Sequence, residues 1–176
     1  MKTINYLFFA GALVLFSAFT ITSTMNWKVS EKHSVKFSGT EVEGVFKTLK
    51  GDVNLDQSDL SASKLSFTID VNSINTGNGM KNKHAVSDKW FDAEKYPTIT
   101  FKSSKVFKEG NQMKVKGTMK IHGISKEMTI PFSFNDNIIK TKFSVQRLDF
   151  KVGTIKGMSK KVSDKISLDV TIPLTK

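Results

Sequence analysis

The sequence predicts an all-β domain of antiparallel strands. Apolar and polar residues alternate along most of the chain after residue 24, turn residues recur at short intervals, and no long stretch has helical periodicity. Strands with one apolar and one polar face are typical of antiparallel sheets. Roughly eight or nine such strands must cover their apolar faces, either by closing into a barrel or by folding into a sandwich.

Residues 1–24 have the composition of a secretory signal peptide. Lys2 precedes an apolar run over residues 6–19, and small and hydroxyl residues follow up to Thr24. We therefore expect cleavage near Thr24, a periplasmic or secreted protein, and one domain over residues 25–176. An uncleaved N-terminal anchor is the alternative, although the apolar run is short for a membrane span. The chain has no Cys, which excludes disulfides and a lipoprotein signal.

Strands are clearest where several apolar residues share one side, as do Leu65, Phe67, Ile69 and Val71. Closure into a barrel would remove the exposed strand edges that invite aggregation. An interior of Phe, Ile, Leu, Val and Met would make any cavity apolar, and Gly117 on the inward face either makes room there or marks a bulge. Similar alternation predicts strands at residues 26–30, 33–37, 51–55, 98–107, 114–121, 127–134, 139–145 and 165–174.

Residues 73–101 contain the one connection that is too long for a simple hairpin turn. We expect a short helix within residues 78–90 and a helix or loop insertion over residues 77–92 that covers one end of the sheet structure. Trp90 and Phe91 either plug that end or pack the helix onto the barrel. No other substantial interruption is expected.

No constellation of residues points to catalysis or to a metal. The three histidines, His33, His84 and His122, have no zinc-site spacing, and no Cys accompanies them. His33 and Ser34 are neighbours on a strand and point to opposite faces, which argues against a nucleophile–base pair. We predict a binding protein, not an enzyme, with no catalytic residue, no metal and no cofactor.

The net charge of +11 comes almost entirely from lysine, because Arg147 is the only arginine. Nucleic-acid sites are usually richer in arginine, so we expect no nucleic-acid partner. Lysines on the outward faces of strands account for the charge, and an anionic membrane surface is the alternative partner. The sequence leaves open whether a homodimer forms.

The order of motifs resembles that of the YceI-like family, exported bacterial proteins with a lipocalin-like barrel that bind polyisoprenoid lipids. Three positions depart from the family pattern: Lys81 and Asn82 replace an Arg-Asp pair, Ala85 replaces a leucine, and Lys151 replaces a glycine. The matching motifs are W-x-V-x-x-x-HS-x-V-x-F (residues 27–37), G-x-F (44–46), SINTG (73–77), KNKH (81–84), S-x-x-WFD (87–92), KYPTITF (95–101), KGTMKIHGISKEMTI (116–130) and R-x-DF (147–150).

The resemblance implies an antiparallel eight-stranded lipocalin-like barrel that holds an isoprenoid chain inside, with its polar head near the mouth. Burial of each CH₂ contributes about 0.8 kcal/mol, so tight binding needs few polar contacts. The head-group candidates are Lys81, Lys83 and His84. The candidate cavity lining, for each member of which ordinary core packing is the alternative, is Phe37, Phe46, Leu65, Phe67, Ile69, Trp90, Phe91, Ile99, Phe101, Val115, Met119, Ile121, Ile130, Phe132, Phe143, Val145, Leu168 and Val170.

Three functional hypotheses follow. The first is an exported protein that holds a quinone or prenyl phosphate for carriage, storage or stress protection. The second is an envelope stress or surface-interaction protein with a filled barrel and a basic exterior. The third is an enzyme acting on a lipid head group, for which His84 is the only attractive candidate.

Overall fold

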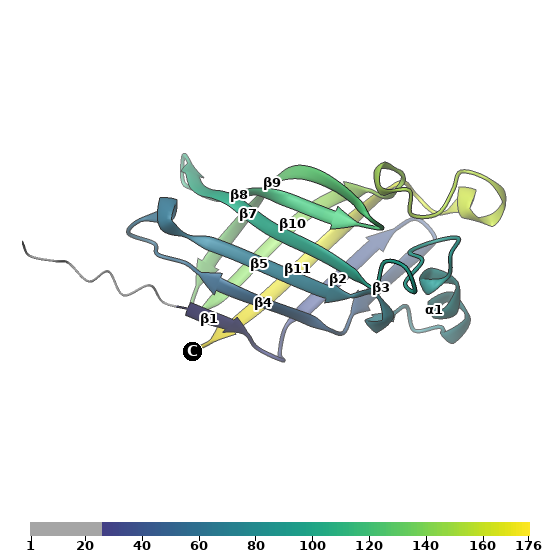
Figure 1. Ribbon diagram of the computed structural model, residues 1–176, viewed down its shortest axis with the longest axis horizontal. Coiled ribbons are helices and arrows are strands. Elements are labelled where there is room, and N and C mark those ends of the chain that lie inside the picture. Colours follow the sequence, from purple (N-terminus) through teal and green to yellow (C-terminus); the bar gives the residue numbers. More distant parts are fainter. Residues whose placement is uncertain (1–25) are drawn as a thin grey trace, which may run out of the picture.

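The computed structural model describes residues 26–176, and strands make up most of it (Figure 1). The predicted signal peptide lies outside the described residues. The strands are β1 (Asn26–Val29), β2 (Ser34–Gly39), β3 (Val42–Phe46), β4 (Leu49–Asn54), β5 (Lys64–Asp70), β6 (Ile74–Asn75), β7 (Thr98–Glu109), β8 (Gln112–Ile121), β9 (Ile124–Asn135), β10 (Ile138–Gln146) and β11 (Lys165–Thr175). The helices are α1 (Gly79–Val86) and the 3-10 helices η1 (Leu60–Ala62), η2 (Val71–Ser73), η3 (Arg147–Phe150) and η4 (Gly157–Lys161).

The strands close into an antiparallel eight-stranded barrel, as predicted, and not into a sandwich. Around the barrel the order is β1-β4-β5-β7-β8-β9-β10-β11, and β11 returns to β1 through the pairs Lys28–Thr175 and Val29–Leu174. The short strands β2, β3 and β6 continue β1, β4 and β5 beyond a kink, and β2 pairs with both β11 and β3. Each long strand therefore follows its neighbour in the chain, which is an up-and-down meander.

His33 holds two of these kinks together. Its Nδ1 lies 2.9 Å from the carbonyl oxygen of Ser30, and the backbone N–H of Leu49 donates to its Nε2 over 3.1 Å. The Nε2 atom also lies 3.2 Å from the carbonyl oxygen of Lys47, so the ring contacts backbone atoms on both sides. His33 thus joins the β1–β2 kink to the β3–β4 kink.

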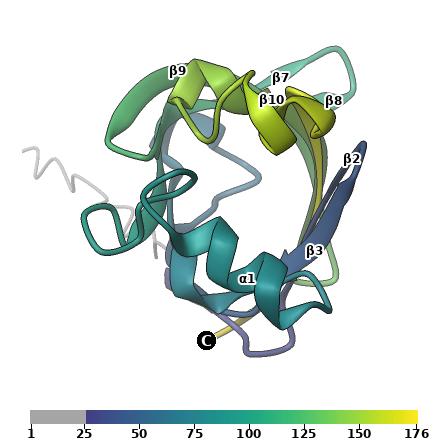
Figure 2. The same ribbon diagram turned by 90° about the vertical axis from the view of Figure 1, so that its right-hand side faces the viewer.

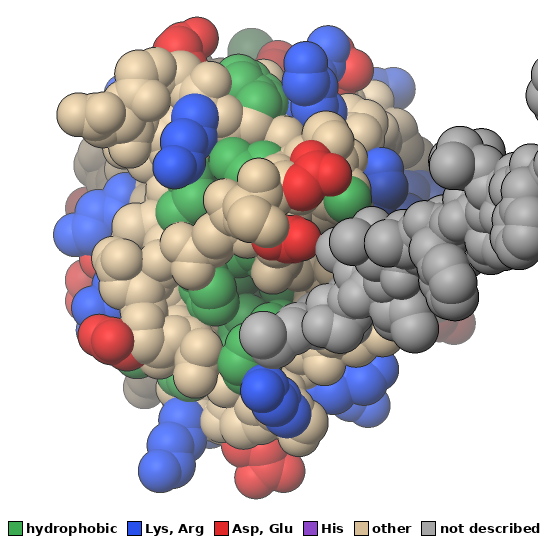
Figure 3. Space-filling model, turned by 90° about the vertical axis from the view of Figure 1, so that its left-hand side faces the viewer, with side chains coloured by type: hydrophobic (Ala, Val, Ile, Leu, Met, Phe, Trp, Pro, Cys, Tyr) green, Lys and Arg blue, Asp and Glu red, His purple; other side chains and the backbone are tan. Residues whose placement is uncertain are grey.

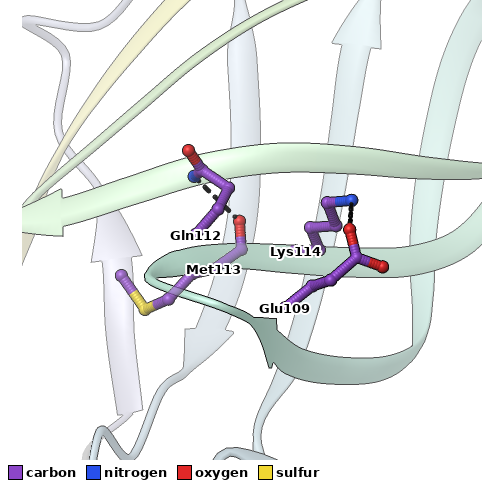
Figure 4. Close-up of polar contacts among 4 residues, drawn as sticks. All are labelled: Glu109, Gln112, Met113 and Lys114. Atoms are coloured by element: carbon purple, nitrogen blue, oxygen red, sulfur yellow. Dashed lines mark hydrogen bonds and ion pairs between the residues drawn. The ribbon is translucent and has the colours of Figure 1, made fainter.

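The hairpin between β7 and β8 turns at Gly110, whose φ of 57° suits glycine. Figure 4 shows its polar contacts: Lys114 pairs with Glu109, and Gln112 donates to the carbonyl of Met113 over 3.1 Å. Gln112 also donates to the carbonyl of Phe132 on β9 over 2.7 Å. The β7–β8 turn is thereby hydrogen-bonded to β9.

Gly117 serves both of the roles considered for it. A Cβ at this position would lie 2.7 Å from Cζ of Phe101, so the ring of Phe101 fills the space left by the missing side chain. The pairing register also shifts between Ser103 and Lys105, directly opposite Gly117. A glycine here accommodates both the bulge and the inward ring.

The barrel wall separates between β9 and β10, which pair only from Ile138 to Lys140. The turn η3 covers this separation. Lys126 of β9 forms an ion pair with Asp149 at 2.8 Å, and Nδ1 of His122 lies 3.1 Å from the carbonyl oxygen of Phe150. Side-chain contacts replace the missing backbone pairs at this place.

Two long connections interrupt the meander, not one. A helix within residues 78–90 is present as α1, but the expectation of no other substantial interruption was wrong. Residues 147–164, between β10 and β11, form a second connection with η3 and η4. It folds around one buried arginine, an arrangement of long-range contacts that strand periodicity does not reveal.

Candidate ligand-binding cavity

The two long connections lie at the same end of the barrel, which we call the mouth (Figures 1 and 2). We call residues 76–97, which contain α1, the helical connection, and residues 147–164 the arginine loop. They meet where the Cζ atom of Arg147 lies 5.3 Å from the ring centroid of Trp90. A Cβ at Gly153 would lie 2.8 Å from Cζ3 of Trp90, so only glycine permits this close approach.

Local sequence signals determine where α1 begins and ends. The Asn78 side chain accepts hydrogen bonds from the backbone N–H groups of Met80 and Lys81, which is an N-cap. The helix ends at Val86, where the Ser87 hydroxyl donates to the carbonyl of His84 over 2.7 Å. The side chain of Asn82 accepts from both the backbone N–H and the hydroxyl of Thr76, each at 2.8 Å. Asn82 therefore ties the helix to Thr76, the residue that follows β6.

Arg147 organises the other side of the mouth. Its side chain is only 6% exposed. It donates to the backbone carbonyls of five residues at 2.8 to 3.3 Å, namely Ser163, Val152, Thr154, Ser159 and Val162. The backbone closes the base of the loop, because the N–H of Arg147 donates to the carbonyl of Asp164 over 2.9 Å.

Arg147 forms no ion pair with another residue in the range 26–176. Burial lowers the pKa of Arg147, and the nearby carboxylate of Asp164 opposes this effect. Arginine nevertheless stays protonated in proteins. One fixed positive charge therefore lies at the mouth, beside the cavity.

An apolar cavity of about 370 Å³ extends from the mouth into the barrel. Its walls come from β2, β3, β6, β7, β8, β10 and β11, and the two connections cover it. The charged and imidazole side chains of the lining, Glu41, Lys81, His84, Arg147 and Lys161, lie at the mouth, and Thr76 and Ser159 are its other polar residues. The apolar lining is Val35, Phe37, Val42, Phe46, Ile74, Ala85, Trp90, Phe91, Ile99, Met119, Ile121, Phe143, Val145, Phe150, Val152, Val162, Ile166, Leu168 and Val170.

Eleven of the candidate lining residues border this cavity: Phe37, Phe46, Trp90, Phe91, Ile99, Met119, Ile121, Phe143, Val145, Leu168 and Val170. The other seven lie on inward faces away from the cavity: Leu65, Phe67, Ile69, Phe101, Val115, Ile130 and Phe132. Five of these seven are buried, since side chains fill that part of the barrel. Direct contact of any of the eighteen with a ligand stays a prediction.

The head-group candidates divide by their position on α1. Lys81, His84 and Ala85 border the cavity, whereas Lys83 does not. Residues 81, 84 and 85 share one helix face, so the exposed Lys83 lies on another. His84 has an exposed side chain at the mouth.

Sequence reasoning missed the contribution of the arginine loop to the cavity. Arg147, Phe150, Val152, Lys161 and Val162 all border it. One signal could have indicated them, since the only arginine of the chain opens the R-x-DF motif. A single arginine among many lysines suggests a site that needs its planar, multiple donors.

The described residues 26–176 contain no group of three or more His, Asp or Glu side chains placed to hold a metal ion. In the same range, no helix has the length and apolar character needed to cross a membrane.

A closed antiparallel barrel with one apolar cavity beneath a helical cover defines the class of lipocalin-like binding barrels. The YceI-like domain model matches residues 21–174, so the chain belongs to the YceI-like family. The resemblance inferred from the motifs is thereby confirmed.

Individual relatives support the same assignment. A UPF0312 protein of Vibrio vulnificus is 33% identical over 113 residues, which are 64% of this chain and 57% of the relative. Protein YceI of Salmonella arizonae is 33% identical over 87 residues, 49% of this chain and 46% of that protein. The matched regions thus span about half the length of these relatives.

Solved structures share the fold. BcnA of Burkholderia cenocepacia superposes with a TM-score of 0.78 at 28% identity, covering 84% of this chain and 99% of that one. A polyisoprenoid-binding domain from Saccharophagus degradans superposes with a TM-score of 0.63, covering 85% of this chain and 97% of that one. Its identity of 15% supports a shared fold only.

Proposed function

We propose that this protein is an exported, non-enzymatic lipid-binding protein that holds a polyisoprenoid-type chain, of the quinone or prenyl phosphate class, for carriage, storage or stress protection. The observation that carries the proposal is the apolar cavity of about 370 Å³ with charged side chains only at its mouth. The structural neighbour from Saccharophagus degradans is a polyisoprenoid-binding domain, which supports this ligand class.

The apolar tail supplies the binding energy. Each buried CH₂ contributes about 0.8 kcal/mol, so a few isoprene units in the cavity suffice for tight binding. The cavity lies near the lower end of the range of roughly 300 to 1,000 Å³ typical of small-molecule sites. A short chain fits within it, and a longer chain extends beyond the mouth or displaces side chains.

The mouth favours a polar or anionic head. Lys81, Lys161 and the buried charge of Arg147 border the cavity there, against one carboxylate, Glu41. The hydrogen bonds of Arg147 to loop carbonyls fix its position, so it contributes mainly a fixed charge. Lys81 and Lys161 are exposed and have the freedom to contact a head group directly.

The open cavity favours this function over a surface-interaction protein with a filled barrel. In a filled barrel, the inward side chains at the mouth end would occupy the space that the cavity leaves. Here Val42, Phe143, Val145, Ile166 and Leu168 border the cavity and are only half-buried.

Thermal unfolding with added short-chain isoprenoid tests the proposal. A ligand at about 100 times its Kd stabilises by about 2.7 kcal/mol, which raises Tm by roughly 5 to 10 °C for a chain of this size. Val145→Trp should fill the cavity and abolish the shift, while the matched control Val145→Ala should keep it. If Val145→Trp folds and retains the full shift, the ligand does not occupy this cavity.

A further inference from the structure

Two exposed apolar side chains lie on the two segments that form the mouth. Met80 on α1 is 69% exposed and Ile155 on the arginine loop is 67% exposed, more than any large buried or half-buried hydrophobic residue of the described range. Single exposed hydrophobic residues are ordinary on a protein surface. Their placement on both mouth segments is what requires an explanation.

Within these two segments, the stretches that carry Met80 and Ile155 concentrate positive charge. Residues 76–87 and 150–163 contain no Asp or Glu, and together they contain Lys81, Lys83, Lys151, Lys156, Lys160 and Lys161. All six of these lysines are exposed. The nearest carboxylates in sequence, Asp88, Asp149 and Asp164, flank these two stretches, and Asp149 is paired with Lys126.

None of these six lysines forms an ion pair with another residue in the range 26–176. The five ion pairs found among residues 26–176 use Lys28, Lys114, Lys116, Lys126 and Lys142, all on barrel strands. The opposite end of the barrel carries both Lys or Arg and Asp or Glu side chains around a hollow with hydrophobic side chains (Figure 3). The two stretches that carry Met80 and Ile155 therefore combine protruding apolar residues with a local excess of lysine.

We propose that the mouth docks on the surface of an anionic lipid bilayer, with Met80 and Ile155 inserted among the lipids. The four lysines outside the cavity lining, Lys83, Lys151, Lys156 and Lys160, then face anionic head groups. Basic residues near such a surface contribute about 1 kcal/mol each, and apolar side chains that enter the boundary add to this. The outward face of α1 carries Met80 and Lys83, while Lys81 and His84 face the cavity. In this orientation the cavity opens directly toward the bilayer.

The inference that the mouth docks on a bilayer does not depend on which ligand the cavity binds. The suggestion that docking serves lipid transfer rests on the proposed function. An isoprenoid is poorly soluble in water, so a mouth held against the bilayer would let the tail pass between the two without crossing water.

Vesicle co-sedimentation tests the docking. The protein as isolated from its host should bind phosphatidylglycerol vesicles much more tightly than phosphatidylcholine vesicles. Raising salt from about 0.1 M to about 1 M, which shortens the Debye length from about 10 Å to about 3 Å, should release most of it. Lys156→Gln with Lys160→Gln should weaken binding by roughly 20-fold or more, since about 1 kcal/mol per lysine corresponds to about fivefold.

Matched variants distinguish an effect of the mouth lysines from an effect of the total net charge. Lys50→Gln with Lys102→Gln removes the same charge from exposed positions on β4 and β7 and should change binding by much less. Met80→Ser with Ile155→Ser, which keeps the charge, should weaken binding about tenfold. Equal losses for both lysine pairs, or no loss for the apolar pair, would overturn the proposed surface.

The two tryptophans report the orientation. Trp90 lies at the mouth, and Trp27 is buried on β1 at the other end of the barrel (Figure 1). Brominated phosphatidylglycerol should quench Trp90, measured in Trp27→Phe, and leave Trp27, measured in Trp90→Phe, nearly unaffected. Preferential quenching of Trp27 would show that the opposite end docks. Measuring bound isoprenoid on the same samples tells a failure of docking from a failure of ligand binding.

Discussion

The guanidinium of Arg147 lies over the ring of Trp90, with 5.3 Å between Cζ and the ring centroid. This contact joins the arginine loop to the helical connection, through two residues that are 57 positions apart in the sequence. A cation over the face of Trp contributes about 0.5 to 2 kcal/mol, more when water is excluded. The cover of the cavity is therefore one unit, not two independent loops.

Replacing Arg147 with lysine should destabilise the protein despite preserving the charge. Lysine has three donors on one nitrogen and cannot reach the five carbonyls that Arg147 binds. Leaving several buried carbonyls without donors should cost about 3 kcal/mol. Urea unfolding measures this, and a loss below about 1 kcal/mol would show that the loop does not depend on Arg147.

Trp90→Ala should lower both stability and lipid retention. Trp90 borders the cavity and is half-buried, so truncation should cost about 2 kcal/mol, less than for a fully buried ring. Trp90→Phe keeps a ring over Arg147 and should retain most of both. A Trp90→Ala variant with unchanged Tm and unchanged bound lipid would refute the role of Trp90 in the cover.

Gly153→Ala and Gly157→Ala form a matched pair within one loop. Both glycines have positive φ, 71° and 58°, so alanine costs about 1 kcal/mol at either position. Only at Gly153 would the new Cβ meet other atoms, 2.8 Å from Trp90 and 2.9 Å from Arg147. We expect Gly153→Ala to lose about 3 kcal/mol or more in chemical denaturation, and equal losses would argue against the close contact.

Lys151→Gly should stabilise the protein by about 1 kcal/mol. Lys151 has a left-handed backbone, with φ 56° and ψ 28°, at the position where family members usually have glycine. Lys156, with φ −109° and ψ 154°, is extended, so Lys156→Gly should not stabilise. The melting temperatures of the two variants, each compared with that of the unmodified protein, test this prediction. A lower Tm for Lys151→Gly would contradict it.

Lys81 and Lys83 should differ in ligand binding although both are exposed on one helix. Lys81 borders the cavity and Lys83 does not. Lys81→Ala should weaken binding of a short prenyl phosphate severalfold, whereas Lys83→Ala should have little effect. Isothermal titration compares them, and equal affinities for both variants would exclude Lys81 as a head-group contact.

The sequence predicted most of the barrel because strand alternation is a local property. Leu65, Phe67 and Ile69 share a face in the sequence and in β5 alike. The capping residue Asn78 likewise indicates the start of α1. The closure of the barrel and the choice against a sandwich required the family resemblance, because alternation is the same in both.

The cavity and its cover were harder to predict, since they depend on contacts between distant segments. Periodicity places Phe101 and Ile99 on the same inward face, yet only Ile99 borders the cavity, because the ring of Phe101 packs over Gly117. The arginine loop has no regular pattern, and its structure comes from the hydrogen bonds of Arg147. Nothing local distinguishes such a loop from a long polar turn.

Mass spectrometry of an organic extract of the protein, purified from its own host, measures whether the barrel holds a lipid. We expect about one isoprenoid lipid per chain in the unmodified protein, retained in Val145→Ala and absent from a folded Val145→Trp variant. No stoichiometric lipid, together with a melting temperature that added isoprenoids do not change, would contradict this expectation.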